Sequence, residues 1–516
     1  MTINSAENKE IERPIQITDK KLLLLISLGW LIILTAIYAL TTWQYGFHRD
    51  ELNFIENARY LDWGYVEYPP FTPFIGRLIL ELFGPSIVAL RFIASLAICI
   101  SMLLTGLMTL ELGGSRSAAI VALMATGLSV IVIFNSRFFS YQTFDFMFWV
   151  LISYFVIKLI YSGDARWWLA IGAVIGLGMQ NKYSIPFFVI GIAGGILLTP
   201  ERRYFKSKWL WLGALLAVLI FLPNLVWQIQ HNFVSLEHQA DMREYNIDVG
   251  RTSSFIIEQF YANTNPAAIP LWLYGLYFCL FSKTGKKYRA LGWMYVIPFV
   301  LFLLASGRFY YMAPTYPMLI ALGASQLINR PGSEQSRSKN FWRKVQYGSL
   351  VVFGLLIMAF IIPITAPGSA WWRIDYELNS EISEEIGWSE LVDEVNRIYL
   401  GIPESERQAT GIMAMNYGEA SAVNLYGSAL GLPKVISGEN TFWFRGYGTS
   451  PPQRLIVLGL EKQYIHKIFK TCRVVGQVPN PYQIENQELR ETPDILLCED
   501  LIYPWPEFWS NFRHYG

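Results

Sequence analysis

The chain has 516 residues, of which 53% are hydrophobic and 16% aromatic, and its mean hydropathy is positive at +0.31. The formal net charge is +1, and lysine and arginine residues occur in short clusters between apolar runs, which excludes an extended basic surface for nucleic acid. This composition also excludes a set of ordinary soluble domains and indicates a polytopic membrane protein.

Eleven apolar runs are candidates to cross the roughly 30 Å hydrocarbon core of a bilayer as helices. The first follows a polar leader with Lys20 and Lys21 and has no small-residue cleavage site before His48, so we expect a retained helix and not a signal peptide. An odd number of spans places the two ends of the chain on opposite sides. The runs lie near residues 21–43, 86–110, 116–134, 143–161, 166–180, 183–199, 208–229, 267–282, 288–306, 309–328 and 346–366.

Lysine and arginine residues gather in three of the segments between these runs, near residues 202–208, 283–289 and 330–344. With eleven spans, these segments and the N-terminus share one side, as the positive-inside rule requires of the cytoplasmic face. The sequence therefore predicts a multi-pass protein of the cell (plasma or inner) membrane whose other loops are extracytoplasmic. Those outer parts are the loops 44–85, 135–142 and 231–266, the break near residue 308, and everything after about residue 366.

The densest polar stretch, residues 47–71, directly follows the first apolar run and reads FHRDELNFIENARYLDWGYVEYPPF. If the part from His48 to Arg59 is helical, Asp50 and Glu51 point about 100° apart and cannot share one role. Asp50 could cap a surface helix, with Glu51 interacting with the positive N-terminal end. A carboxylate in a half-buried cleft at the membrane edge could instead act as a general base. Both interpretations stay open at this point.

Cations are few on the predicted outer face, and several could neutralise a phosphate at headgroup level, the alternative being that each one snorkels to the interface. Arg137 and Arg308 are our first candidates because both lie at the ends of apolar runs, and Arg59 and Lys182 come next. The pair Tyr310 and Tyr311 follows Arg308, where it would join an aromatic belt or line a substrate pocket. The outer-face cations are Arg49, Arg59, Arg137, Lys182, Arg243, Arg251 and Arg308.

The chain changes character after residue 366, where charged residues become common and short apolar strands alternate with polar helical stretches. We expect a membrane domain over residues 1–366 and an extracytoplasmic α/β domain over 367–516 with strands near 411–415, 455–458 and 495–497. Cys472 and Cys498 in this domain could form a disulfide in an oxidising compartment or remain two buried thiols.

The sequence has no metal-spaced cluster of cysteine and histidine residues, and it predicts no cofactor with certainty. His48, Asp50 and Glu51 could bind a divalent cation, but a hard-cation site usually needs more oxygen ligands. We therefore assign no metal-binding residues, and a divalent cation that assists the reaction stays an open alternative.

The segment FHRDEL followed by WGYVEYPPF resembles the first outer loop of bacterial family 39 glycosyltransferases, relatives of protein O-mannosyltransferases and lipid A aminoarabinose transferases. Five further segments resemble the family in the expected order, so the resemblance covers nearly the whole chain. It implies a GT-C architecture, a polyprenyl-phosphate-linked sugar donor, and transfer, usually with inversion, on the non-cytoplasmic side. The segments are GLGMQNKYS (176–184), PNLVWQIQHNFVSLEH (223–238), GRFYYMAPTYP (307–317), NYGEASAVNLYG (416–427) and ISGENTFWFRGYG (436–448).

The resemblance also assigns roles. Asp50 falls on the presumed base, and Asp145 looks like the second acidic position of the family. Glu51, beside Asp50, is our second catalytic candidate and would orient Arg59 or the acceptor. Glu67 stands where relatives often have Asp or His, and Glu439 where they often have His, which affects the identity of the substrate more than the type of reaction. The substrate pocket predicted in this way contains His48, Asp145, Tyr310, Tyr311 and His238.

The sequence thus predicts a membrane glycosyltransferase that moves a hexose or pentose from a polyprenyl phosphate to a hydroxyl of a lipid, glycan or protein acceptor. A transferase of lipid-linked oligosaccharide is an alternative, and so is a membrane protein whose outer domain binds a partner. A transporter or flippase is a third, but transporters generally show pseudo-symmetric halves and broken helices that meet at the midplane. Here no repeat is evident and the polar residues gather at one face, which favours chemistry at the membrane surface.

Overall fold

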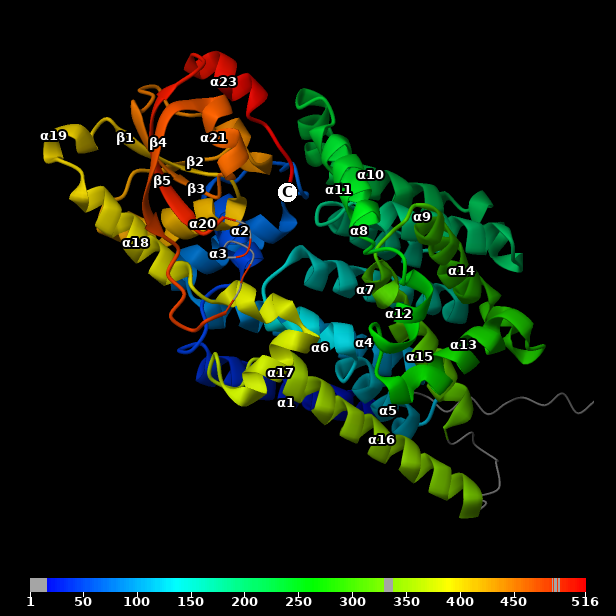
Figure 1. Ribbon diagram of the computed structural model, residues 1–516. Helices are drawn as coiled ribbons and strands as arrows, with labels where there is room; N and C mark the ends of the chain where they lie inside the picture. Colours follow the sequence, from blue (N-terminus) through cyan, green and yellow to red (C-terminus); the bar gives the residue numbers. More distant parts are fainter. Residues whose placement is uncertain (1–15, 329–336, 485, 487–489, 491) are drawn as a thin grey trace, which may run out of the picture.

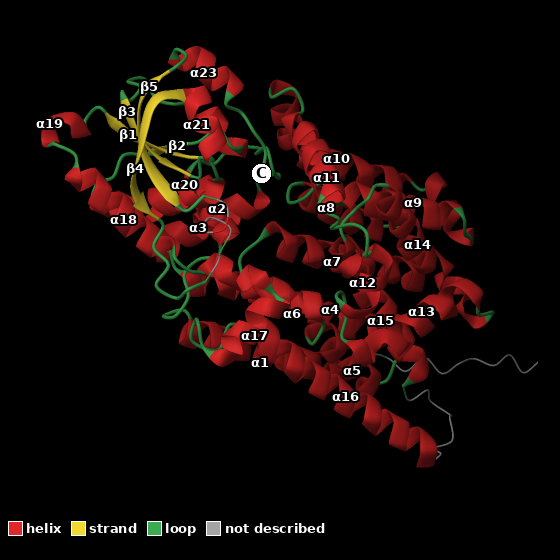
Figure 2. Ribbon diagram, in the orientation of Figure 1, coloured by secondary structure: helices red, strands yellow, loops and turns green. Residues whose placement is uncertain are grey.

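The computed structural model describes residues 16–328, 337–484, 486, 490 and 492–516, and part of the third basic segment, residues 329–336, lies outside the described residues. Helices make up most of the protein, and a small sheet lies at one end of the helical part (Figure 2). The helices α2 (Arg49–Arg59) and α3 (Phe71–Phe83) lie between the sheet and the long apolar helices (Figure 1).

Each of the eleven apolar runs forms a helix or a pair of consecutive helical elements. In chain order these are α1 (Ile17–Thr41), α4 (Ile87–Glu111), α5 (Arg116–Gly127) with α6 (Val130–Arg137), α7 (Tyr141–Ser162), α8 (Trp167–Met179), α9 (Ile185–Leu197) with η1 (Pro200–Lys206), α10 (Lys208–Gln230), η2 (Pro266–Ala268) with α13 (Ile269–Phe281), η3 (Thr284–Tyr288) with α14 (Arg289–Leu304), η4 (Phe309–Thr315) with α15 (Tyr316–Leu327), and α16 (Arg337–Ile361).

Within the described residues, six helices are long and apolar enough to cross a membrane, or eight if the bent pairs α5/α6 and α9/η1 each count as one span. The angle between the two helices is 57° in the first pair and 108° in the second. The helix α8 and the segment Pro266–Phe281 are shorter apolar helices. The number of eleven spans stays a prediction.

Local sequence sets the ends of these helices. The hydroxyl of Ser86 accepts a hydrogen bond from the Ala89 N–H at 3.3 Å before α4, and Ser115 accepts one from Ala118 at 3.2 Å before α5. Side chains of this kind replace the hydrogen bonds that the first turn lacks. The helix α7 ends at Gly163, whose φ of 69° is the left-handed conformation that glycine adopts without a steric cost.

Two glycines allow α8 and α10 to pack closely. A Cβ atom at Gly172 would lie 2.0 Å from the carbonyl oxygen of Gly213, and one at Gly213 would lie 2.2 Å from that of Trp168. Small residues at such a crossing let two backbones approach, which is how helices associate inside a bilayer.

The polar stretch after α1 forms two short helices, α2 (Arg49–Arg59) and α3 (Phe71–Phe83). His48 caps α2, because its Nδ1 accepts a hydrogen bond from the Asp50 N–H at 3.1 Å and its own N–H donates to Glu51 Oε2 at 2.9 Å. These two bonds form a capping box. The interpretation of Asp50 as the helix cap is therefore wrong, and its carboxylate makes no capping bond. The predicted outer loop 231–266 holds α11 (Val234–Asp248) and α12 (Phe255–Tyr261).

The C-terminal part is built on a five-stranded sheet with the order β2-β1-β3-β5-β4. The strand β1 is parallel to β2 and β3, whereas β5 is antiparallel to β3 and β4. The strands predicted from the sequence lie in β1, β3 and β5. In chain order the elements are α17 (Ala370–Leu378), η5 (Ser380–Glu385), α18 (Trp388–Gly401), α19 (Glu404–Arg407), β1 (Thr410–Ala414), α20 (Tyr417–Tyr426), η6 (Gly427–Leu430), β2 (Val435–Ile436), η7 (Asn440–Arg445), β3 (Arg454–Leu458), α21 (Lys462–Ile468), β4 (Phe469–Gln477), β5 (Asp494–Leu501) and α23 (Trp505–Asn511).

Cys472 and Cys498 face each other on β4 and β5 and are joined by a disulfide. Of the two alternatives for this pair, the structure therefore contains the bridge. The thiols of Cys99 and Cys279 are free and buried in the helical part.

Candidate active site

The carboxylate of Asp50 is partly exposed at the start of α2 and faces the C-terminal part of the chain. Its Oδ1 accepts a hydrogen bond from the hydroxyl of Tyr417 at 2.8 Å, and Tyr417 is the first residue of α20. The base predicted from the sequence is thus in contact with a residue that follows it by 367 positions.

Lys182 lies in the short connection between α8 and α9, and aromatic rings surround its ammonium group. The Nζ atom is 5.1 Å from the ring centre of Tyr141, 5.6 Å from that of Tyr310 and 4.8 Å from that of Tyr311. Ring faces carry negative potential, so such a group of rings holds a cation in place while leaving N–H donors for an anion.

Asp145, one turn into α7, is the counter-ion of Lys182, with Oδ2 at 3.6 Å from Nζ. It is buried and also accepts hydrogen bonds from the Ser184 hydroxyl at 2.8 Å and from Trp149 Nε1 at 3.1 Å. A buried carboxylate with this many partners fixes the position of the lysine. Asp145 thus supports the cation Lys182.

Arg308 precedes η4 and is held by one residue of α11 and by one of η4 itself. Its Nη2 and Nε donate to Asn246 Oδ1 of α11 at 2.6 and 3.1 Å, and its Nη1 donates to the Tyr310 hydroxyl at 3.2 Å. A guanidinium has five N–H donors, so these three bonds leave two for a ligand.

Tyr141 links these groups. Its ring contacts Lys182, and Lys182 and Arg308 both contact Tyr310. Tyr141 also interacts electrostatically with Asp50. One carboxylate and two cations therefore converge at the ends of α7, α8, α9 and α14 and the start of α2. We refer to Asp50, Tyr141, Lys182, Arg308, Tyr310 and Tyr311 as the polar cluster.

Glu51 has a structural role, which corrects the prediction of a catalytic position. It is fully buried, and it accepts hydrogen bonds from Arg91 Nη2 at 3.0 Å and from the Phe139 N–H at 2.9 Å, in addition to its bond in the capping box. Its partner is not Arg59 and its oxygens are not open to an acceptor.

Arg137 is also corrected, because it is fully buried in an ion pair with Glu385 at 2.8 Å. Glu385 pairs with Arg91 as well, at 3.1 Å, so that Glu51, Arg91, Glu385 and Arg137 form one buried ionic network between α2, α4, α6 and η5. A guanidinium used in this way is not available to a lipid phosphate.

Arg59 and His48 lie outside the polar cluster as well. Arg59, at the end of α2, donates to the carbonyl of Asn424 at 3.1 Å and lies 3.7 Å from Glu56. His48 is buried, stacks on Phe138 with ring centres 4.5 Å apart, and points its Nε2 toward Glu381 at 3.5 Å.

The side chains of His48, Asp50 and Glu51 face different partners, so these three residues do not form a site for the divalent cation considered above. Within the described part of the chain, no three His, Cys, Asp or Glu side chains are grouped so as to hold a metal ion.

His238, on α11, is buried against the ring of Tyr515 with centres 5.6 Å apart, and it contacts no member of the polar cluster in the described structure. Burial lowers the pKa of His238 to about 4, so the imidazole is neutral at pH 7. This predicted pocket residue is therefore part of the packing between α11 and the end of the chain.

The two departures from the family pattern lie where the first outer loop meets the C-terminal part. Glu67 is held by the Thr441 hydroxyl at 2.5 Å and by Asn53 Nδ2 at 3.4 Å, and burial raises the pKa of Glu67. The carboxylate of Glu439 accepts a hydrogen bond from the N–H of Tyr417. Both side chains therefore hold segments next to Asp50.

Sequence reasoning missed Tyr417, Tyr141, Arg91 and Glu385. The role of Arg91 could have been inferred from the sequence, because a lone arginine inside an apolar run requires a buried acidic partner. Tyr417 lies in the resembling segment 416–427, but nothing in its local sequence pointed to Asp50.

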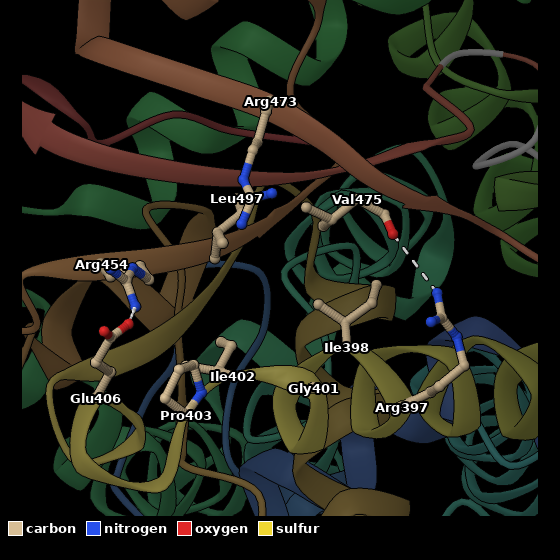
Figure 3. A pocket seen from close by; sticks show the side chains of 10 residues that line it. All are labelled: Arg397, Ile398, Gly401, Ile402, Pro403, Glu406, Arg454, Arg473, Val475 and Leu497. Carbon is tan, nitrogen blue, oxygen red and sulfur yellow. Dashed lines mark hydrogen bonds and ion pairs between the residues drawn. The ribbon is translucent and has the colours of Figure 1, made fainter.

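A separate surface hollow lies between α18, β3, β4 and β5 in the C-terminal part (Figure 3). Its volume is about 370 Å³, and it shares no residue with the polar cluster. Arg454 in its wall pairs with Glu406 and Glu499, and Arg397 pairs with Glu394. Because two of its three arginines are neutralised within the protein and it lies outside the polar cluster, we do not assign the chemistry to this hollow.

Comparisons with known proteins identify the fold. The fold is that of a GT-C membrane glycosyltransferase: ArnT from Cupriavidus metallidurans bound to undecaprenyl phosphate superposes with a TM-score of 0.54 over 92% of this chain and 97% of that chain, at 13% identity. The apo state of the same protein gives a TM-score of 0.50. The fold class predicted from the sequence is thus confirmed.

Residues 67–227, which include Asp145 and Lys182, match the family described as dolichyl-phosphate-mannose-protein mannosyltransferase. The chain is also 26% identical over 258 residues to the lipid A galacturonosyltransferase RgtD of Rhizobium johnstonii, a match that spans 47% of this chain and 52% of the length of that relative. The resemblance to family 39 glycosyltransferases is therefore confirmed.

Proposed function

We propose that the protein is a membrane glycosyltransferase that moves a sugar from a polyprenyl phosphate to an acceptor hydroxyl at the extracytoplasmic surface. The observation that carries this proposal is the polar cluster, in which an accessible carboxylate and two cations converge. Expulsion of a phosphate needs positive charge beside the departing group, and the attacking hydroxyl needs a base. The names of the relatives, a lipid A galacturonosyltransferase and ArnT with undecaprenyl phosphate, support the choice of donor class.

The step is a single displacement with inversion at the anomeric carbon. The acceptor oxygen forms a bond to that carbon while its proton passes to Asp50, and the bond from the carbon to the phosphate oxygen breaks with its electron pair. The polyprenyl phosphate that leaves carries the resulting negative charge, which Lys182 and Arg308 balance.

The experiment that tests this function uses purified protein in lipid nanodiscs with a panel of undecaprenyl-phosphate-linked hexoses, pentoses and uronic acids. Envelope extract from cells that lack the gene supplies the acceptor. We expect release of free undecaprenyl phosphate with one donor, and mass spectrometry of lipids and glycans from cells with and without the gene identifies the product. If no donor in the panel released undecaprenyl phosphate, the proposed function would be wrong.

Lys182→Ala and Arg308→Ala are each expected to raise the apparent donor KM by about 10- to 100-fold, because a hydrogen bond to a charged group contributes about 1.5 to 3 kcal/mol. Initial rates measured across donor concentrations test this. Arg243→Ala is the matched control: Arg243 is an exposed cation on α11 that donates to the Ala305 carbonyl at 2.8 Å. An unchanged donor KM in both cluster variants would contradict the assignment of phosphate binding to Lys182 and Arg308.

The proposed orientation predicts the outcome of thiol labelling in intact cells. A cysteine introduced as Lys206→Cys should react only with membrane-permeant reagents, whereas Ser405→Cys should react with impermeant ones. The native thiols of Cys99 and Cys279 are buried, so the background is low. The disulfide of the C-terminal part supports this orientation, since such bonds persist in oxidising compartments. Labelling of both positions by the impermeant reagent would contradict the orientation.

A further inference from the structure

The C-terminal part of the chain reaches the polar cluster through the hydroxyl group of Tyr417. Tyr417 donates a hydrogen bond to Asp50 Oδ1 at 2.8 Å, while Oδ2 makes no hydrogen bond with any of the residues that the structure describes. The two oxygens of the same carboxylate are therefore in different states: one is held, and the other is open to a ligand.

Several contacts fix the position of Tyr417 at the start of α20. The Asn416 side chain caps this helix by accepting from the Glu419 N–H at 2.8 Å, and the Tyr417 N–H donates to Glu439. The guanidinium of Arg49 lies 5.3 Å from the centre of the tyrosine ring.

Gly418 explains how α20 comes so close to α2. A Cβ atom at this position would lie 2.5 Å from Cγ of Arg49 and 3.0 Å from the ring of Trp388. Any larger residue would have to displace these side chains, so the glycine keeps the tyrosine within reach of the carboxylate.

Burial raises the pKa of Tyr417 well above its usual range, so the phenol keeps its proton at neutral pH. The hydroxyl is therefore the donor and the carboxylate oxygen is the acceptor. A hydrogen bond of this kind restricts rotation of the carboxylate and determines which oxygen faces the incoming substrate.

We propose that Tyr417 is a positioning residue, which holds Asp50 Oδ1 so that Oδ2 takes the proton from the acceptor hydroxyl. The C-terminal part thereby completes the active site of the membrane part. This inference rests on the proposed function, because it assigns Tyr417 a role in the same transfer step.

Tyr417→Phe tests the role, since it removes the hydroxyl and keeps the ring. The expected result is a fall in kcat of about 10- to 100-fold with the donor KM unchanged, because the lost bond is made to a charged group that acts in the transition state. Tyr426→Phe is the matched control: it removes a hydroxyl at the other end of α20, where the tyrosine contacts the backbone of Phe47 and not Asp50. The control should keep the wild-type kcat.

A double variant separates positioning from general structure. If Tyr417 acts through Asp50, then adding Tyr417→Phe to Asp50→Asn should cause no further loss of rate, because effects of residues that act as a unit are not additive. A second loss of the same size in the double variant would overturn the inference, and so would a wild-type rate for Tyr417→Phe. Activity near wild type in Asp50→Asn alone would instead contradict the proposed base.

A second substitution covers the case in which Tyr417→Phe does not fold. Replacement of Tyr417 by 3,5-difluorotyrosine keeps the ring and the hydroxyl but makes the phenol a stronger donor. A stronger donor favours the charged carboxylate, so the acid limb of the rate profile should move to lower pH. An acid limb at the wild-type position would overturn the inference.

Discussion

Asp50→Asn is expected to lower the rate of sugar transfer by about 10² to 10⁴-fold, the usual contribution of a positioned general base. The amide keeps the size of the side chain and can still accept the hydrogen bond from Tyr417, but it cannot take a proton. Donor binding should be retained, because the cations of the polar cluster are untouched. The measurement is kcat and donor KM of the purified variant in nanodiscs.

Asp62→Asn is the control for this variant. Asp62 lies in the same outer loop and is exposed, and it accepts a hydrogen bond from Trp227 Nε1 at 2.8 Å. The Asp62→Asn variant should keep the wild-type kcat. If folded Asp50→Asn protein turned over like wild type, the base would have to be sought elsewhere in the polar cluster.

The second large effect concerns stability. Glu385→Gln should destabilise the protein by about 3 to 5 kcal/mol, because it leaves Arg91 and Arg137 buried without their shared counter-charge. Thermal unfolding in detergent measures this as a lower melting temperature. Glu394→Gln, at an exposed pair with Arg397, should leave the melting temperature unchanged. Equal melting temperatures for the wild type and Glu385→Gln would contradict the role of the network.

The network also predicts a dependence on pH. Burial alone would raise the pKa of Glu385, but the charges of Arg91 and Arg137 outweigh it and lower the pKa below the usual 4.5. A carboxyl with a lowered pKa in the folded state contributes stability that is present above about pH 4.5 and is lost as the pH falls further. The melting temperature of wild type should therefore fall below pH 4.5, and that of Glu385→Gln should change less.

Much of this architecture follows from hydrophobic pattern. All eleven apolar runs are helical, and the three expected strands lie in β1, β3 and β5. The pattern could not say which runs are short, bent or buried inside the protein, because that depends on neighbouring helices. The bend between α5 and α6 shows this: the sequence reads as a single run from 116 to 134.

The candidate site was predictable only in part. Asp50, Lys182, Arg308, Tyr310 and Tyr311 belong to the polar cluster, and Asp145 pairs with Lys182; each lies at the predicted outer end of an apolar run. The structural roles of Glu51 and Arg137 could not be recognised from the sequence, because their partners Arg91 and Glu385 are distant in the chain. Charge alone does not distinguish a cation that binds a ligand from one that holds two helices together.

The cap of α2 has a practical consequence. His48 and Glu51 hold the start of the helix, and the side chain of Asp50 contributes no bond to it, so a change of that carboxylate should leave its surroundings intact. Asp50→Asn protein should then bind donor and acceptor together without consuming them. Such a stalled ternary complex could be isolated from cells with its natural substrates, and their chemical identity read directly by mass spectrometry.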